Sequence, residues 1–286
     1  MRLGCHVSIA GGIEQSISRA KALEINTMQI FSKNSRAWQE KTYTNSEIIE
    51  FQRKLQKSTL SPIFIHASYL INLASPDEEI YTKSIAAFRE ELKRGGDLLV
   101  NLSQPYLIIH PGAHRGAGEE FGLNRIIKAL RNVLKQSSYL KLSTMVLLEN
   151  TSGMGSGLGH SFSQLKYIME QIDYPDKVGV CFDTCHAFAA GYNLAEEQGI
   201  EETIAQFDRE IGLDKLKVIH LNDSKYGLGS KRDRHTHIGE GFIGTNGFRL
   251  LINHPQLKDL PFILETPKKN DKDDRRNIEL VRSLRE

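Results

Sequence analysis

Eight short apolar runs, each followed by a segment with helical periodicity, repeat along the whole chain of 286 residues. No linker or change in composition separates the repeats, so they predict a single domain over residues 1–286. Eight strand–helix units in a chain of this length predict an α/β fold, the (β/α)8 or TIM barrel. A doubly wound open sheet is the alternative, but Gly4, Gly11 and Gly12 do not form the GxGxxG loop typical of it.

The pattern gives approximate bounds for each element. The expected strands are Leu3–Val7, Thr27–Phe31, Pro62–His66, Tyr106–His110, Met145–Glu149, Val178–Asp183, Lys217–Asn222 and Pro261–Glu265. The expected helices are Ile13–Leu23, Glu47–Lys57, Pro76–Leu102, Leu123–Gln136, Phe162–Ile172, Leu194–Ile211, Gly247–Ile252 and Asp273–Leu284.

Six consecutive strands, the third to the eighth, each end on or next to a side chain that can bind a metal ion. The carboxyl ends of barrel strands meet at one mouth, so side chains scattered in sequence are expected to meet in space. One such histidine or glutamate alone is most often a hydrogen-bonded structural residue. Six on consecutive strand ends indicate a site that suits Zn²⁺, Mn²⁺ or Fe²⁺. These residues are His66, His110, Glu149, Asp183, His220 and Glu265.

Three further candidate ligands lie close to these strand ends. His186 follows Asp183 by three residues and is expected to open the turn after that strand. Asp233 and His235 are two residues apart in DRHTHIGEG, which places both on one side of an extended loop. Nine ligands exceed the need of one tetrahedral ion, and a carboxylate can bridge two ions. The sequence therefore predicts two metal ions and is compatible with three. The cysteines have no zinc-finger spacing and are expected to be reduced thiols that pack in the core of a cytoplasmic protein.

Cationic and aromatic side chains occur in three loops expected at the same mouth. Such mixtures are typical of phosphate contacts combined with wedges or stacking platforms for nucleic acid. Each residue alone could instead be a solvated charge or a packed ring. The residues are Lys33, Arg36 and Trp38 after the second strand, Tyr69 and Leu70 after the third, and Lys225 and Arg232 after the seventh.

The overall charge limits how a nucleic acid could be held. The net charge is +2, so binding would depend on local patches and not on a strongly basic surface. No run approaches the roughly 18 apolar residues of a membrane span, so no membrane partner is expected. No oligomer interface is evident in the sequence, and a monomer is expected.

Together these motifs resemble the endonuclease IV family of apurinic/apyrimidinic (AP) endonucleases over essentially the whole chain. The motifs, in family order, are GCHVSIAGG, KNSRAW, HASYLINL, HPGAH, LLENTSGMGS, GVCFDTCHAFAAGY, HLNDSK, DRHTHIGEGFIG and LETP. The resemblance implies three zinc ions, which manganese or iron can replace. The implied sets are His66, His110 and Glu149 for the first ion, the bridging Glu149 with Asp183, His220 and Glu265 for the second, and His186, Asp233 and His235 for the third.

The resemblance also implies an activity. It is that of a zinc-dependent phosphodiesterase of base excision repair, which would cut double-stranded DNA 5′ to an abasic site and leave a 3′-hydroxyl and a 5′-deoxyribose phosphate. A metal-activated hydroxide would attack the phosphodiester, with Glu149 as the catalytic bridge. Arg36, Tyr69 and Leu70 match the residues that enter the minor groove when the abasic nucleotide is flipped out. Ala67, after His66, departs from relatives that carry a polar residue there.

Two other functions fit parts of the pattern. A metal-dependent sugar isomerase or epimerase on a related barrel would use one or two ions, and has no need of the His186, Asp233 and His235 set or of cationic loops. A protein that binds abasic sites without cutting them would need no bridged metal pair. Metal stoichiometry and an incision assay separate the three.

Overall fold

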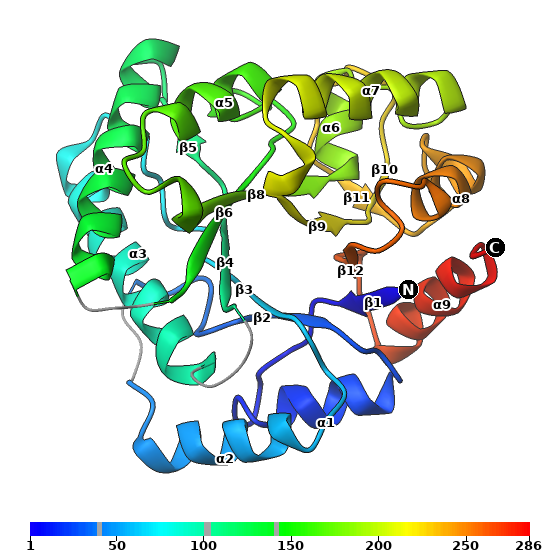
Figure 1. Ribbon diagram of the computed structural model, residues 1–286, viewed down its shortest axis with the longest axis horizontal. Coiled ribbons are helices and arrows are strands. Elements are labelled where there is room, and N and C mark those ends of the chain that lie inside the picture. The colour runs from blue at the N-terminus through cyan, green and yellow to red at the C-terminus, as the bar shows by residue number, and fades with distance from the viewer. Residues whose placement is uncertain (39–41, 100–103, 140–142) are drawn as a thin grey trace.

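The computed structural model describes residues 1–38, 42–99, 104–139 and 143–286. Its centre is one sheet of eight parallel strands in the order β1-β12-β9-β8-β6-β4-β3-β2 (Figure 1). His6 forms a parallel bridge with Gln29, and the Val7 N–H donates to the Gln29 carbonyl at 2.8 Å, so the two outer strands close the sheet into a barrel. The strands are Arg2–Cys5 (β1), Met28–Phe31 (β2), Ile63–His66 (β3), Tyr106–Ile109 (β4), Met145–Glu149 (β6), Val178–Asp183 (β8), Leu216–His220 (β9) and Pro261–Leu264 (β12).

Helices surround the barrel, one after each strand in chain order (Figure 1). Their first turns are set by local sequence: capping boxes at Thr44 with Glu47 and at Asn270 with Asp273 begin two of them. The helices are Gln15–Ala22 (α1), Asn45–Gln56 (α2), Glu78–Leu99 (α3), Glu119–Tyr139 (α4), Phe162–Glu170 (α5), Glu197–Glu210 (α7), Gly244–Asn253 (α8) and Asp271–Ser283 (α9). Short 3₁₀ turns at Pro175–Lys177 and Leu213–Lys215 lead into β8 and β9.

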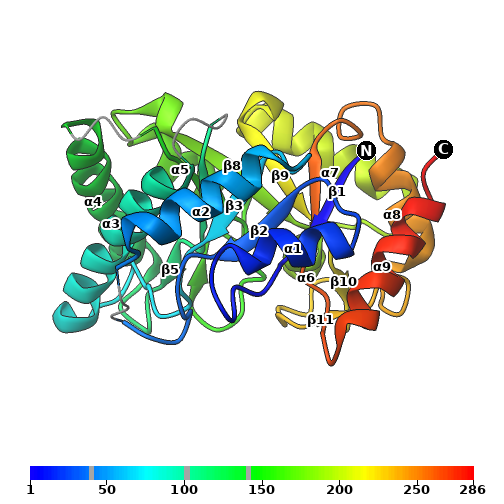
Figure 2. The ribbon, with the colours of Figure 1, turned by 90° about the horizontal axis from the view of Figure 1, so that it is seen from below.

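Additional small elements follow the carboxyl ends of the strands. Gly112–Ala113 (β5) pairs with Gly157–Leu158 (β7), and Asp223–Ser224 (β10) pairs with His235–Thr236 (β11), each pair antiparallel. A seven-residue helix, Thr184–Ala190 (α6), follows β8 directly. Several of these elements lie at the lower end of Figure 2, whereas the two chain termini lie toward the upper end. The loops that follow the strands therefore build up one end of the barrel, its mouth.

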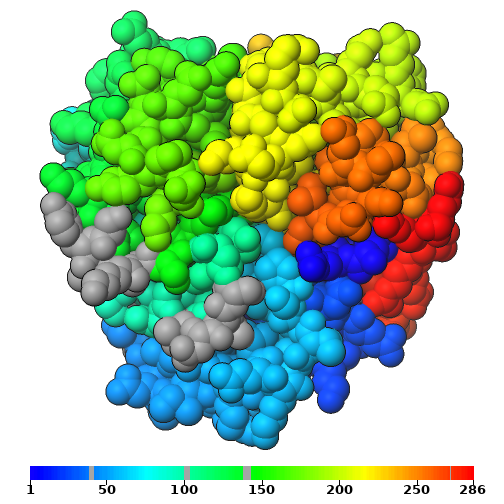
Figure 3. Space-filling model, viewed as in Figure 1, coloured from blue at the N-terminus to red at the C-terminus, as the bar shows by residue number. Residues whose placement is uncertain are grey.

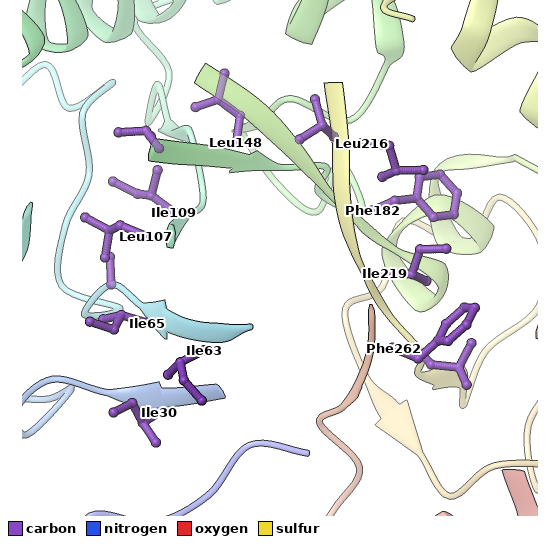
Figure 4. Packing of buried hydrophobic residues seen from close by; sticks show 14 of the residues in the cluster. Ile30, Ile63, Ile65, Leu107, Ile109, Leu148, Phe182, Leu216, Ile219 and Phe262 are labelled. Atoms are coloured by element: carbon purple, nitrogen blue, oxygen red, sulfur yellow. The ribbon is translucent and has the colours of Figure 1, made fainter. Parts of the chain in front are cut away.

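Side chains of the strands alternate between two hydrophobic clusters because strand residues point to opposite faces in turn. The outward-pointing residues, including Ile65, Ile109 and Phe182, pack beneath the helices (Figure 4). Six inward-pointing residues fill the barrel interior, and no channel is visible from the end where the strands begin (Figure 3). They are Phe64, Ile108, Leu147, Cys181, Val218 and Ile263.

The barrel expected from the sequence is confirmed, and the open sheet is wrong because the sheet closes. The bounds of β6 and β8 agree with the prediction, β1 and β9 differ by one or two residues at both ends, and the other strands differ by one residue at one end. The expected helix Pro76–Leu102 begins at Glu78, and its last residues, 100–102, lie outside the described residues. Helix α6 was not predicted, since a turn was expected at the motif TCH.

Among the residues that the structure describes, no helix combines the length and the apolar composition that crossing a membrane requires.

Candidate metal centre

The same alternation that fills the barrel interior directs the candidate ligands to its mouth. Each of the six strand-end residues stands two positions after a residue of the inner cluster, as His66 follows Phe64 and Glu149 follows Leu147. Side chains two apart on a strand share a face, so all six point toward the barrel axis one layer above the apolar plug. His66, Glu149, Asp183 and His220 end β3, β6, β8 and β9, and His110 and Glu265 directly follow β4 and β12.

Glu149 occupies the middle of the cluster. Its Oε2 lies 3.1 Å from Nε2 of His66 and 3.1 Å from Nε2 of His110. Its Oε1 lies 3.1 Å from Nδ1 of His220. The two oxygens of one buried carboxylate thus face two separate groups of imidazoles, which is the arrangement that a ligand shared between two ions requires.

A second group forms around His220. Its Nδ1 lies 3.2 Å from Oε2 of Glu265 and 3.8 Å from Oδ2 of Asp183. One ligand atom from each of these residues and from Glu149 falls within 4.8 Å of the others, close enough to share one cation. Cys181 approaches the same point from the inner cluster. Burial raises the pKa of its thiol to about 12, so it stays protonated at neutral pH and packs, as expected from the sequence.

The third group lies beside the second, toward the loop that carries β11. Nε2 of His186 is 3.1 Å from Oδ1 of Asp233, and Nε2 of His235 is 3.7 Å from the same oxygen. Asp183 Oδ2 is 3.6 Å from Nε2 of His235, so this carboxylate faces both the second and the third groups. Asp183 also caps α6 by accepting from the His186 N–H at 2.8 Å. That cap fixes the spacing between the two groups.

Four of the histidines use their remaining ring nitrogen to donate to a fixed oxygen. Nδ1 of His66 faces the Ala67 carbonyl at 2.8 Å, and Nδ1 of His186 faces the Asn150 carbonyl at 2.9 Å. Nδ1 of His235 faces the Glu265 carbonyl at 3.1 Å, and Nε2 of His220 faces Oε1 of Gln29 at 2.7 Å. Because a carbonyl only accepts, each pairing places a proton on that nitrogen, and the nitrogen directed at the cluster is the one that can bind a cation when the ring is neutral.

Several residues that were not predicted from the sequence orient the candidate ligands. The Asn222 amide donates to Oδ2 of Asp183 at 2.7 Å and accepts from the Glu265 N–H at 2.7 Å. The buried Asp223 carboxylate accepts backbone N–H groups of the loop that follows β11, among them Gly241 at 2.9 Å and Ile243 at 3.0 Å. Asn222 and Asp223 adjoin His220 in the motif HLND, which was a usable signal.

Metal ions fit this cluster on the evidence of its own atoms. Within the described part of the chain, Nε2 of His235 is buried without a hydrogen-bond partner, although it points toward two carboxylates. A buried polar atom left unpaired costs free energy that a bound cation would remove. The donor set of imidazole nitrogens and carboxylate oxygens is the one that zinc prefers when cysteine thiolates are absent. We therefore assign the three groups as candidate sites for metal ions.

The pKa values of the cluster show how strongly its charges are coupled. Burial would raise the pKa of Glu149, but the charges of His110 and His220 and the imidazole hydrogen bonds hold it well below its ordinary value. Burial would lower the pKa of His186, but Asp183 and Asp233 raise it well above 6.5. Without metal, protons on these imidazoles balance the carboxylates, and metal ions would have to displace them.

These shifts predict a pH-dependent gap between the stabilities of the metal-free and zinc-loaded proteins. His186 and His220 have raised pKa values, so their stabilising effect on the metal-free fold is full below about 6.5 and is lost as the pH rises through the raised values. The lowered pKa of Glu149 affects stability only at acid pH. We expect the difference in Tm between zinc-loaded and chelator-treated protein to widen from pH 6 to pH 9 in thermal unfolding. A constant or narrowing difference would contradict it.

Gln29 on β2 is the residue that sequence reasoning had least chance of finding. Its Nε2 donates to Oε1 of Glu265 at 2.5 Å and faces Nδ1 of His6 at 3.0 Å, while its Oε1 faces His220. Burial lowers the pKa of His6 to about 4, so this ring is neutral and can accept. Gln29 therefore holds one histidine and one carboxylate of the second group in place.

Gln29→Leu is expected to weaken binding of zinc at the second group by roughly 10-fold, because partners behind the ligands orient them. Competition with a colorimetric chelator measures the affinity of each ion. Gln52→Leu on the outer helix α2, whose amide donates to the Asp97 carbonyl, is the matched control. Equal zinc affinities in Gln29→Leu and wild-type protein would contradict the inference that Gln29 orients ligands of the second group.

The loop residues predicted to contact DNA divide into two groups in the structure. Arg36, Lys225 and Arg232 are exposed, and the Arg232 guanidinium lies over the Tyr226 ring at 4.6 Å. Tyr69 is 62% exposed although its ring packs edge-on against Phe31 at 5.2 Å and lies 5.9 Å from the His66 ring. Leu70 is half-buried beside it. These residues stay candidates for contacts with a nucleic acid.

The structure corrects the prediction for Lys33 and changes the one for Trp38. Lys33 is buried, and its ammonium donates to the carbonyls of Ala37 at 2.6 Å and Trp38 at 3.0 Å. A charge used to hold its own loop is not presented to a phosphate. Trp38 is half-buried and packs on the outer hydrophobic cluster, which is the rim-packing role that was its alternative.

Comparison with known proteins gives a consistent result. Residues 17–286 match a family described as xylose isomerase-like TIM barrel. The chain is 49% identical over 285 residues to the probable endonuclease 4 of Halothermothrix orenii, covering 100% of this chain and 99% of that protein. It is 34% identical to the endonuclease IV of Thermus thermophilus, whose crystal structure matches with a TM-score of 0.87 and coverage of 99% of this chain and 98% of that one. A D-tagatose 3-epimerase-like protein shares 20% identity at a TM-score of 0.74, over 99% of this chain and 97% of that one, which shows a common fold alone.

Proposed function

Because this chain belongs to the endonuclease IV family of AP endonucleases, we propose that it cuts double-stranded DNA on the 5′ side of abasic sites, leaving a 3′-hydroxyl and a 5′-deoxyribose phosphate. The observation that carries this proposal is Glu149, whose two oxygens face two different groups of imidazoles at 3.1 Å. A binding protein has no use for that arrangement, whereas hydrolysis of a phosphodiester does.

We propose three zinc ions per chain. His66, His110 and Glu149 would hold the first, and Glu149 with Asp183, His220 and Glu265 the second. His186, Asp233 and His235 would hold the third, with Asp183 close enough to touch both neighbouring sites. When bound, such ions lower the pKa of a water to near ~7 and offset charge on a phosphate.

The protein's own groups supply orientation and charge balance. The carbonyl contacts of His66, His186 and His235 and the amide of Gln29 hold the rings in the required tautomers. The carboxylates of Glu149, Glu265 and Asp233 would repel a polyanion if left unpaired, and the pKa of Asp233 is lowered to about 2, so it stays charged. Their pairing with cations allows a protein of net charge +2 to accept DNA at this mouth.

Recognition would come from the loops at the rim. We propose that exposed Lys225 and Arg232 hold phosphates, and that Arg36, Tyr69 and Leu70 enter the minor groove and fill the gap left when the abasic nucleotide turns out of the helix. Flipping costs least where no base is stacked or paired, so selection of abasic sites follows from the same step.

A duplex that contains a single tetrahydrofuran abasic analogue, labelled at one 5′ end, tests the proposal. Zinc-loaded protein should convert it to one shorter product with a free 3′-hydroxyl that a polymerase extends, and should leave the undamaged duplex intact. Protein that carries zinc and binds the damaged duplex without cutting would exclude the nuclease function. Metal analysis of the same sample should give close to three ions per chain.

A further inference from the structure

A buried carboxylate lies outside the metal cluster and has no part in the chemistry above. Glu91 is on α3, on the flank of the barrel, and is 1% exposed. Glutamate is almost never buried to this degree unless its charge is paired and its oxygens are hydrogen-bonded. The partners of Glu91 therefore show what it organises.

Glu91 joins two loops that follow neighbouring strands. The Ser32 hydroxyl, just after β2, donates to its Oε2. Burial raises the pKa of Glu91 above its ordinary value, and this rise is opposed by the Ser32 hydrogen bond, the charges of Lys33 and Arg94, and the backbone of Ser68, just after β3. One side chain thus lies against residues of two separate loops and beside the buried Lys33 charge.

Further bonds make the two loops one unit around this carboxylate. The Ser68 hydroxyl donates to the Ser35 carbonyl at 2.7 Å, linking the loops directly. The Tyr43 hydroxyl donates to the Ser32 carbonyl at 2.8 Å. The Lys33 ammonium binds the carbonyls of Ala37 and Trp38 and so ties the two ends of the first loop together.

This unit presents side chains that the sequence singled out for DNA distortion. Arg36 projects from the first loop and is exposed. Tyr69 projects from the second loop with 62% of its surface exposed. A wedge made of residues from two loops inserts as one body only if the loops keep a fixed spacing, and ordering them at the moment of binding would cost affinity.

We propose that Glu91 is a positioning residue for lesion recognition: it locks the loops 32–38 and 67–70 together so that Arg36 and Tyr69 enter a damaged duplex as a preformed wedge. This inference rests on the proposed function. It adds that discrimination between abasic and intact DNA depends on a carboxylate that touches neither the DNA nor the metal cluster.

The test uses Glu91→Ala and Glu91→Gln in the full-length, zinc-loaded protein, with Glu90→Gln as control because Glu90 is the exposed neighbour on the same helix. Glu91→Ala is expected to raise KM for the abasic duplex roughly 10-fold and to change kcat by less than about 3-fold. Binding of undamaged duplex and the zinc content should not change. Glu91→Gln should fall between wild type and Glu91→Ala, since its amide oxygen can still accept.

A fluorescent 2-aminopurine placed opposite the lesion reports insertion of the wedge. If Glu91→Ala only lowered the stability of the protein, the molecules that remain folded would still give the wild-type signal. The 2-aminopurine signal should drop in Glu91→Ala, and Glu91→Ala should have little further effect when Tyr69 and Leu70 are already alanine.

If Glu91→Ala does not fold, Ser32→Ala serves as the test variant. It removes one hydrogen-bond donor to Glu91 with a small change in volume, and should give the same changes more weakly. A fall in kcat at constant KM, a loss of zinc, or additivity with the Tyr69 and Leu70 changes would overturn the inference. Absence of incision by wild-type protein would instead reject the proposed function.

Discussion

Glu149→Ala is expected to lower the rate of incision at an abasic site by roughly 10³-fold or more and to reduce the number of bound metal ions. The reason is geometric: Glu149 is fully buried, and its two oxygens face His66 and His110 on one side and His220 on the other. Alanine removes a ligand from two groups at once, and among the described residues the first group contains no second carboxylate. Single-turnover incision and metal analysis of the same preparation measure both effects.

Glu149→Gln separates the loss of charge from the loss of volume. The amide keeps the shape and can still coordinate through one oxygen, so it should retain more metal than Glu149→Ala while staying strongly impaired. Glu170→Ala, at an exposed glutamate on α5, is the control for an unrelated carboxylate. Turnover near the wild-type value in Glu149→Ala, or an unchanged metal content, would exclude the bridging assignment.

The sequence was sufficient to predict the barrel and to bring the nine candidate ligands to one place. Two periodicities explain this success: the strand–helix repeat predicts the barrel, and the alternation along each strand directs His66 and Glu149 inward above Phe64 and Leu147. The convergence of residues from distant segments needs no knowledge of loop conformation. For that reason the strand ends were predictable where the loops were not.

Residues whose role depends on their partners could not be read from the chain. Gln29 resembles any polar residue near the end of a strand until closure of the barrel sets it beside His220 and Glu265. The prediction for Lys33 failed for the converse reason, because a lysine in a loop suggests a phosphate contact unless the fold is known to bury it. Glu91 lies in a helix, and nothing in the sequence of that helix indicates that the loops after β2 and β3 both approach this side chain.

The third ligand group is the feature that distinguishes a nuclease from a sugar isomerase on a similar barrel. An isomerase that works with one or two ions needs only the groups around Glu149. His186 and His235 form a further set with Asp233, whose Oδ1 lies 3.1 Å from Nε2 of His186 and 3.7 Å from Nε2 of His235. His235 is the member to change, because its Nε2 is buried without a partner among the described residues and would gain most from a cation. A substitution there leaves Glu149 and its neighbours intact.

His235→Ala is therefore expected to lower kcat for incision roughly 10²-fold and to release one ion per chain, while the two ions of the groups that share Glu149 stay bound. The lost ion would offset charge that develops during the reaction more than charge on the bound duplex, so KM for the abasic duplex should change less than kcat. His237→Ala is the matched control, since His237 lies two residues along the same loop and is hydrogen-bonded to Asn277 at 3.0 Å. Wild-type kcat in His235→Ala, with the same two ions per chain in variant and wild-type protein, would mean that the third group is structural, and would favour a two-metal enzyme over the nuclease proposed above.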